Sequence, residues 1–305
     1  MIRRCSPIVV ALAMLIAMPA YAADKLRVVA TFSVIGDIVV NVGGDHVALT
    51  TIVGPDGDSE LYQPTPADAA TVAQANIVFM NGLNDEFEPW LEKLLKQAKF
   101  PGAKIIVSRG VKALSAEDEH PSGGKPHAVA LDQHAWLDPR NGVIYTKNIT
   151  EALARIDPAN AADYRARAAA YTKELQALDA WARAEMAAVP QTKRRALSSH
   201  DSMQYLANAY SITMISIAGW TNKSEPSAAD IARLTQQIRK ERVRALFLDS
   251  ITDPRAMQSI GKETGAVIGG TLYGDSLSKP GGEADTYLKM LRHDIATVKA
   301  GLLLN

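Results

Sequence analysis

Short β-branched runs alternate with segments of helical periodicity in the first part of the chain. The runs Leu26–Phe32, Val47–Val53 and Ile77–Met80 are typical of buried strands, and helices are expected at Ile35–Val42 and from Pro64 onward. Strand, helix and strand in regular succession indicate a parallel sheet with helices on both faces. This part of the chain is therefore predicted to form an α/β lobe.

The same order of elements returns in the last third of the chain. Residues 63–81 and 225–249 share the order Pro, Ser or Thr, Ala, Asp, then helix, then strand, which predicts a second lobe of similar plan. The strands expected there are Arg195–Ser199, Thr213–Ile217, Val243–Leu248 and Ala266–Leu272, with helices at Ser202–Tyr210 and from Pro226 onward.

A long segment free of helix breakers separates the two predicted lobes. Asp157 and Pro158 are typical of a helix start, and neither Gly nor Pro follows them until Pro190. Such a helix of about 32 residues would be about 48 Å long and would act as a stiff link. The expected division is a leader at 1–22, an N-terminal lobe at 23–150, a linking helix region at 151–190 and a C-terminal lobe at 191–305.

The first 22 residues have the three parts of a secretory signal peptide. Arg3 and Arg4 precede an apolar run that is too short to cross a bilayer comfortably, and small residues favour cleavage after Ala22. The single cysteine, Cys5, lies before the apolar run, whereas a lipid-attachment cysteine would follow it. We therefore expect secretion without a lipid anchor, and a mature chain held together by its core instead of disulfides.

The charge pattern excludes one large class of partner. The chain has 33 basic and 33 acidic residues, and no basic stripe is interleaved with aromatic residues. Nucleic acid is therefore not an expected partner.

Two of the six histidines lie where a ligand site would be expected. His134 precedes a helix predicted to begin near Asp138, and His200 follows a predicted strand at its carboxyl end, where open α/β sheets bind ligands. From the residues alone, metal ligation and an ordinary structural role are even alternatives. His46 and His293 are interpreted as surface residues.

The carboxylates are harder to assign. Asp56, Asp58 and Glu60 share one loop, Asp249 ends a strand, and Asp275 follows the last predicted strand. Local capping of turns is the favoured role for each of them.

The sequence contains none of the common enzyme motifs that were considered. His-Glu-x-x-His, Gly-x-Ser-x-Gly, a phosphate-binding loop and a cysteine nucleophile are all missing.

Six segments carry a resemblance to a known family: Val53–Pro66, Asn81–Leu83, His134–Pro139, Ser199–Leu206, Gly274–Leu277 and Tyr287–Met290. Together they resemble the metal-binding receptors of zinc- and manganese-type ABC importers, over essentially the whole mature chain. The resemblance implies two lobes joined by a long rigid helix, one bound metal, and no enzymatic activity. It also implies a periplasmic monomer whose partner is an ABC permease of the inner membrane, with a periplasmic metallochaperone as a further candidate.

The resemblance also implies a set of metal ligands. By position His134, His200 and Asp275 are the second, third and fourth ligands, whereas the first is normally a histidine and here is Glu60. Two imidazoles and two carboxylates suit Zn²⁺ or Mn²⁺ as cargo, with Fe²⁺ ranked behind them. If Glu60 points away, three ligands and a water remain. Asp201 and Asp249 are candidates to orient a histidine.

Two other functions are also compatible with the sequence. One is an adhesin-like protein that uses the same fold to bind a partner, and another is a metallohydrolase with an open metal position. The polar segment 117–127, with His120 and His127, stands where zinc receptors often carry a His-rich insertion, but an ordinary disordered loop is favoured. Trp136 and Trp220 are expected to pack near the site.

Overall fold

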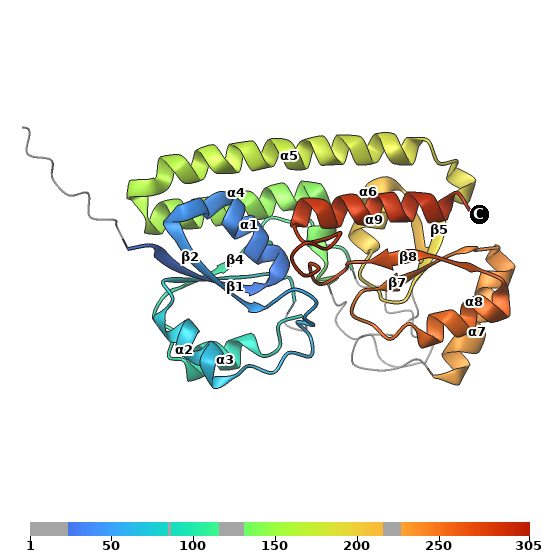
Figure 1. Cartoon of the computed structure of the whole chain (residues 1–305), viewed down its shortest axis with the longest axis horizontal. Coiled ribbons are helices and arrows are strands. Elements are labelled where there is room, and N and C mark those ends of the chain that lie inside the picture. The colour runs from blue at the N-terminus through green and yellow to red at the C-terminus, as the bar shows by residue number, and fades with distance from the viewer. Residues whose placement is uncertain (1–23, 85–86, 116–130, 216–226) are drawn as a thin grey trace, which may run out of the picture.

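The protein has two α/β lobes, each built on a four-stranded parallel sheet (Figure 1). The structure, a computed structural model, describes residues 24–84, 87–115, 131–215 and 227–305. The N-terminal sheet has the order β2-β1-β3-β4, with β1 at Leu26–Phe32, β2 at Val47–Val53, β3 at Ile77–Met80 and β4 at Ala103–Ile106. The first three strands have the predicted bounds, and β4 was not predicted.

The C-terminal sheet repeats this arrangement, with the order β6-β5-β7-β8. Its strands are β5 at Arg195–Ser198, β6 at Thr213–Ile215, β7 at Ala245–Asp249 and β8 at Val267–Leu272. In both sheets the first strand of the lobe is central and pairs with the second and third strands of that lobe. The prediction of two lobes of similar plan is confirmed.

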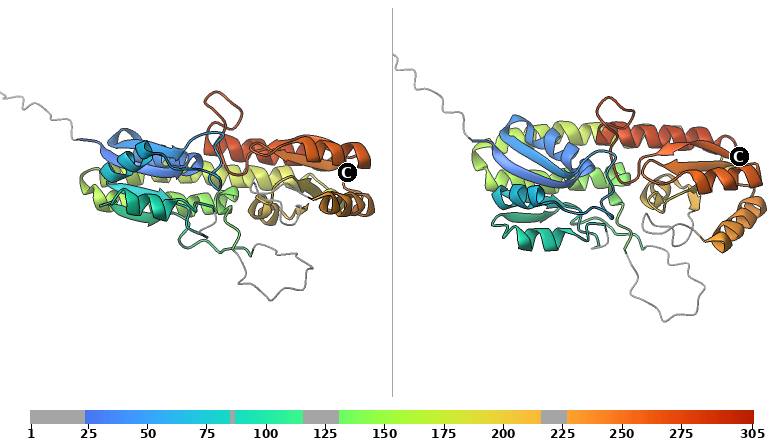
Figure 2. Two further views of the ribbon diagram at one scale, coloured as in Figure 1. Left: turned by 90° about the horizontal axis from the view of Figure 1, so that it is seen from below. Right: turned by 60° about the horizontal axis from the view of Figure 1, so that its bottom comes forward.

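Helices cover both faces of each sheet (Figures 1 and 2). Helix α4 is N-capped by Asp138, whose carboxylate accepts from the backbone N–H of Arg140, and α2 begins with a capping box between Thr65 and Asp68. The helices are α1 Ser33–Gly43, α2 Pro66–Gln74, α3 Leu91–Gln97, α4 Pro139–Ile156, α5 Ala161–Ala187, α6 Gln204–Tyr210, α7 Ala228–Glu241, α8 Arg255–Thr264 and α9 Tyr287–Leu302.

Helix α5 runs along both lobes and is the predicted long link (Figure 1). It has 27 residues, which gives about 40 Å, and is shorter than predicted because Pro158–Asn160 forms a separate 3-10 turn. The expected cap at Asp157 is also absent, since its carboxylate accepts from the side chains of Asn160 and Tyr164 instead. One face of α5 is buried and packs on α1, α4 and α9, so the helix is fixed to both lobes.

The larger of two hydrophobic cores among the described residues continues from the N-terminal sheet into the C-terminal lobe, and the smaller one lies within the C-terminal lobe. At the centre of the larger core the fully buried ring of Trp136 packs against Phe32 and Phe87, with ring centroids 4.9 and 4.8 Å away. The Trp136 Nε1–H donates to the carbonyl oxygen of Gly274, 2.8 Å away in the C-terminal part of the chain. This side chain therefore joins the two lobes at the core.

The position of Trp136 gives a prediction about stability. Trp136→Ala should lower the free energy of unfolding by about 3–5 kcal/mol, because it leaves a large cavity and an unpaired carbonyl. Urea unfolding followed by circular dichroism measures this change. Val40→Ala is a suitable control, since Val40 is 52% exposed on α1. Equal effects of the two substitutions would contradict the role assigned to Trp136.

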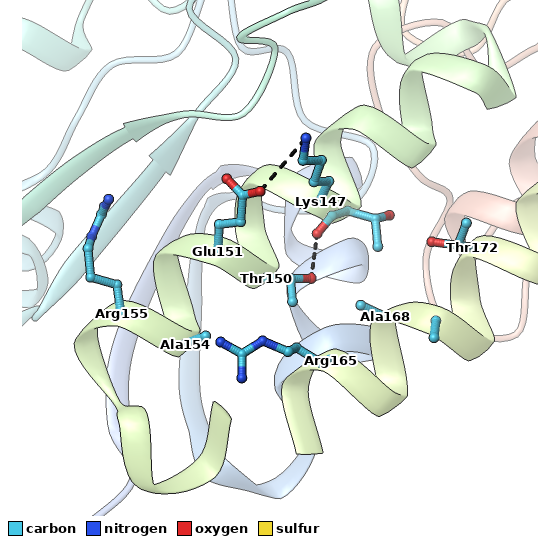
Figure 3. Close-up of a pocket in the computed structure, with 10 residues that line it drawn as sticks. Lys147, Thr150, Glu151, Ala154, Arg155, Arg165, Ala168 and Thr172 are labelled. Carbon is cyan, nitrogen blue, oxygen red and sulfur yellow. Dashed lines mark hydrogen bonds and ion pairs between the residues drawn. The ribbon is translucent and has the colours of Figure 1, made fainter. Parts of the chain in front are cut away.

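A groove lies between α4 and α5 (Figure 3). Some of its polar groups are paired locally: Lys147 lies 3.8 Å from Glu151, and the Thr150 hydroxyl donates to the carbonyl of Thr146. None of the four predicted ligands lines this groove.

Within the described ranges, no helix has the length and apolar character needed to cross a membrane.

Candidate metal centre

His134 lies in the N-terminal lobe, in the turn that precedes α4. The 3-10 turn Ala135–Leu137 follows it directly, and the imidazole is only 5% exposed. The carboxylate of Asp132 accepts from the backbone N–H of His134 at 2.9 Å and lies 2.8 Å from ring atom Nδ1. Because a carboxylate only accepts, Nδ1 carries a proton and Nε2 is the atom presented to the site.

His200 lies in the C-terminal lobe, two residues after β5. Its backbone neighbour Ser199 is fixed by donation from its N–H to the carbonyl of Phe247, on the adjacent strand β7. The ring is 4% exposed. His200 therefore stands at the carboxyl edge of the second sheet, where the sequence placed it.

Asp275 follows β8, but its segment is bonded to the N-terminal lobe. The Leu277 N–H donates to the Ser33 hydroxyl at 3.0 Å, and the Leu277 carbonyl accepts from the Asp56 N–H at 2.9 Å. At the start of α9, the Tyr287 N–H donates to the carboxylate of Asp37 on α1. These bonds hold Asp275, 1% exposed, against the side of the site formed by His134.

Glu60 is turned inward and is 7% exposed. The carboxylate of Asp58 accepts from the backbone N–H of Glu60 at 2.8 Å and of Leu61 at 3.1 Å, which closes a tight turn. The Ser59 carbonyl accepts from the indole N–H of Trp90. The loop is therefore fixed on both sides of Glu60, and the side chain does not point to solvent.

The four side chains converge on one buried point. Ligand atoms of Glu60, His134 and His200 lie within 4.8 Å of one another. Asp275 completes the group: its Oδ1 lies 3.2 Å from Nε2 of His134, and its Oδ2 lies 3.5 Å from Nδ1 of His200. The two imidazole rings are perpendicular, with centroids 5.3 Å apart. This spacing suits a single cation between them.

Two ring nitrogens at this point make no hydrogen bond with any described residue. They are Nε2 of His134 and Nδ1 of His200, both buried. Buried polar atoms are normally hydrogen-bonded, whereas these two have the carboxylates of Asp275 and Asp249 only as charged neighbours, at 3.2 to 3.8 Å. A single metal ion between the two rings would fit as a partner of both nitrogens.

The site is strongly biased toward protonated histidines when no metal is bound. Burial alone lowers the pKa of His134, but Asp275 and Asp132 raise it well above its usual value. Burial acts in the same way on His200, while Asp275 and Asp249 raise its pKa to about 9. Protons and a divalent cation therefore compete for the same nitrogens.

The other residues singled out from the sequence have varied positions. Asp249 lies 3.8 Å from Nδ1 of His200, whereas Asp201 accepts from the side chain of Gln204. His46 bonds to Asp163, and Nε2 of His293 lies 3.0 Å from the carbonyl of Thr271, so both are half-buried structural residues. His120, His127 and Trp220 lie outside the described residues.

Two residues of the site were missed by sequence reasoning. Asp132 orients His134, and the amide of Gln133 donates to Glu60. The spacing Asp-x-His in Asp132–His134 was a usable indication, because a carboxylate two residues before a ligand is a common orienting partner. Nothing in the sequence indicated the contact of Gln133, since it joins loops 73 residues apart.

A family profile described as the periplasmic component A of a zinc-uptake complex matches residues 28–301. The chain is 33% identical to a manganese ABC transporter substrate-binding lipoprotein of Streptococcus pneumoniae, over 92% of this chain and 89% of that protein. It is 31% identical to an iron-binding protein of Yersinia pestis, over 93% and 88%. The periplasmic zinc-binding protein TroA of Treponema pallidum superposes with a TM-score of 0.81 at 27% identity, over 91% and 99%.

Fold, site and sequence agree on the class, a substrate-binding protein for a metal. The chain belongs to the zinc-uptake component A family, whose relatives include substrate-binding components of metal ABC transporters. These relatives are described as binding proteins that serve metal transporters.

Proposed function

We propose that the protein captures one divalent transition metal in the periplasm with Glu60, His134, His200 and Asp275 and delivers it to an ABC permease. The observation that supports this most is the convergence of four buried ligand side chains from separate elements of both lobes. The two carboxylates of this set would supply negative charge to a bound cation.

We propose Zn²⁺ or Mn²⁺ as the cargo, with Fe²⁺ ranked behind them. Zn²⁺ accepts imidazole nitrogen and carboxylate oxygen in a four-coordinate site, whereas Mn²⁺ favours oxygen-rich sets. Relatives are described as manganese, iron and zinc binders, which is consistent with a mixed ligand set. At equal free concentrations the affinity order favours Zn²⁺ over Mn²⁺.

We further propose cleavage after Ala22, a monomer, and an inner-membrane permease as the main partner. A periplasmic metallochaperone is a further candidate partner. The proposed lobes are 23–150 and 191–305, with 151–190 as the linking region. This division agrees with the two separate sheets and with the course of α5.

Metal uptake by cells that lack this receptor tests the proposed function. Wild-type protein should restore accumulation of isotopic zinc or manganese at low external concentration, and His200→Ala should not, because it removes a ligand that no neighbour can replace. His293→Ala, in the same lobe but remote from the site, should restore uptake fully. Restoration by His200→Ala equal to wild type would contradict metal delivery through this site.

A further inference from the structure

A second buried side chain is bonded to the unusual ligand of the site. The amide Nε2 of Gln133 donates to Oε1 of Glu60 over 2.5 Å, and both residues are 7% exposed. A carboxylate only accepts, so the amide presents its N–H to Glu60. A donor held against a carboxylate in a dry environment fixes its direction more firmly than the same bond would in water.

Gln133 is itself held by the N-terminal sheet. Its backbone carbonyl accepts from Nδ2 of Asn81, directly after β3, at 2.8 Å. Asn81 is fixed in turn by the hydroxyl of Tyr145, which donates to its Oδ1, and by that of Ser108, which donates to its carbonyl. The bond to Glu60 is therefore anchored to β3 and α4, and not to a freely moving loop.

The short segment Asp132–His134 acts on two ligands at once. Asp132 orients the ring of His134, while Gln133 contacts Glu60 from the adjacent position in the chain. Displacement of this segment would therefore move both ligands together. The segment thereby couples the first ligand position to the second.

We propose that Gln133 is a positioning residue for metal binding, which holds the Glu60 carboxylate in its ligating orientation before the metal arrives. The proposal rests on the proposed function, because it takes Glu60 as a ligand. Fixing a flexible side chain in advance removes an ordering cost that binding would otherwise incur. The Gln133 amide suits a carboxylate partner, because its N–H groups donate and a carboxylate only accepts.

Gln133→Met tests the proposal, since methionine has a similar length but no donor. Zinc affinity, measured by competition with a chromophoric chelator, should fall about 10–100-fold, the usual effect of losing a partner that orients a ligand. Gln204→Met is the matched control: it breaks another amide–carboxylate bond, of 2.9 Å to Asp201, and should leave the affinity unchanged.

A double-mutant cycle with Glu60→Ala separates positioning from general stability. If Gln133 acts through Glu60, Gln133→Met should cost nothing further once Glu60 is alanine. An equal loss of zinc affinity in both backgrounds, or no loss in the wild-type background, would overturn the proposal. Failure of the wild-type protein to bind zinc or manganese would instead overturn the proposed function, so the two failures are distinct.

Discussion

Replacement of both His134 and His200 by alanine should abolish stoichiometric metal binding. The two imidazoles come from different lobes and are the nitrogen ligands of the proposed set, so the double variant keeps only Glu60 and Asp275. We expect zinc affinity to fall by more than about 1000-fold, well beyond the about 10–100-fold that loss of an orienting partner causes. Isothermal titration with zinc and with manganese measures the loss.

The matched control for this experiment is the double variant His46→Ala and His293→Ala. It removes the same number of imidazoles, one from each lobe, but neither side chain lies at the site. This control should bind one metal ion with unchanged affinity. Tight binding that survives the loss of His134 and His200 would place the metal elsewhere and would refute the assigned site.

Metal affinity should depend steeply on pH up to about pH 9, and not only below the ordinary pKa of histidine. The carboxylates around the site raise the pKa of His200 to about 9 and that of His134 well above its usual value in the metal-free protein. Each histidine must lose a proton before it binds the metal. Between pH 8 and pH 6 we expect a loss of about a hundredfold in affinity for each histidine that titrates above this range.

The same pKa shifts predict that the stability of the metal-free protein and the additional stabilisation by metal change with pH in opposite directions. A histidine whose pKa is raised on folding stabilises the metal-free fold fully below pH 6.5, and this contribution is lost as the pH rises through about 9. The melting temperature of the metal-free protein should therefore fall over this range. The additional stabilisation by saturating metal should increase, because deprotonation strengthens binding. Parallel trends would contradict the assigned pKa shifts.

Most of the fold was predictable from local patterns. Strands β1, β2 and β3 are runs of β-branched residues bounded by turns, and their ends agree with the prediction. Strand β4, Ala103–Ile106, was missed because it has four residues, none of which is fully buried. Its position is set by pairing with β3, a tertiary effect that a local pattern does not contain.

The candidate site was predictable only in part. The position of His200 was predictable, because this residue directly follows a predicted strand and open α/β sheets bind ligands at the carboxyl ends of their strands. The approach of Asp275 to His134 depends instead on a segment that returns to the N-terminal lobe through bonds to Ser33 and Asp37. Contacts of this kind join residues more than 200 positions apart, and no local pattern indicates them.

In the proposed ligand set, Glu60 decides whether the metal has four protein ligands or three. The structure places its carboxylate among the histidines, and its loop is closed by Asp58 and Trp90. A fourth ligand from this residue closes the coordination shell around zinc. A water in its place would leave an open position of the kind that metallohydrolases use.

A crystal structure of the zinc-loaded protein, with anomalous data at the zinc absorption edge, tests the central claim most directly. We predict one strong anomalous peak about 2.0–2.2 Å from Nε2 of His134, a ring nitrogen of His200, and carboxylate oxygens of Glu60 and Asp275. A peak elsewhere on the molecule would contradict the assignment of the site. A peak bound by the two histidines and Asp275 with water in place of Glu60 would contradict the four-ligand set.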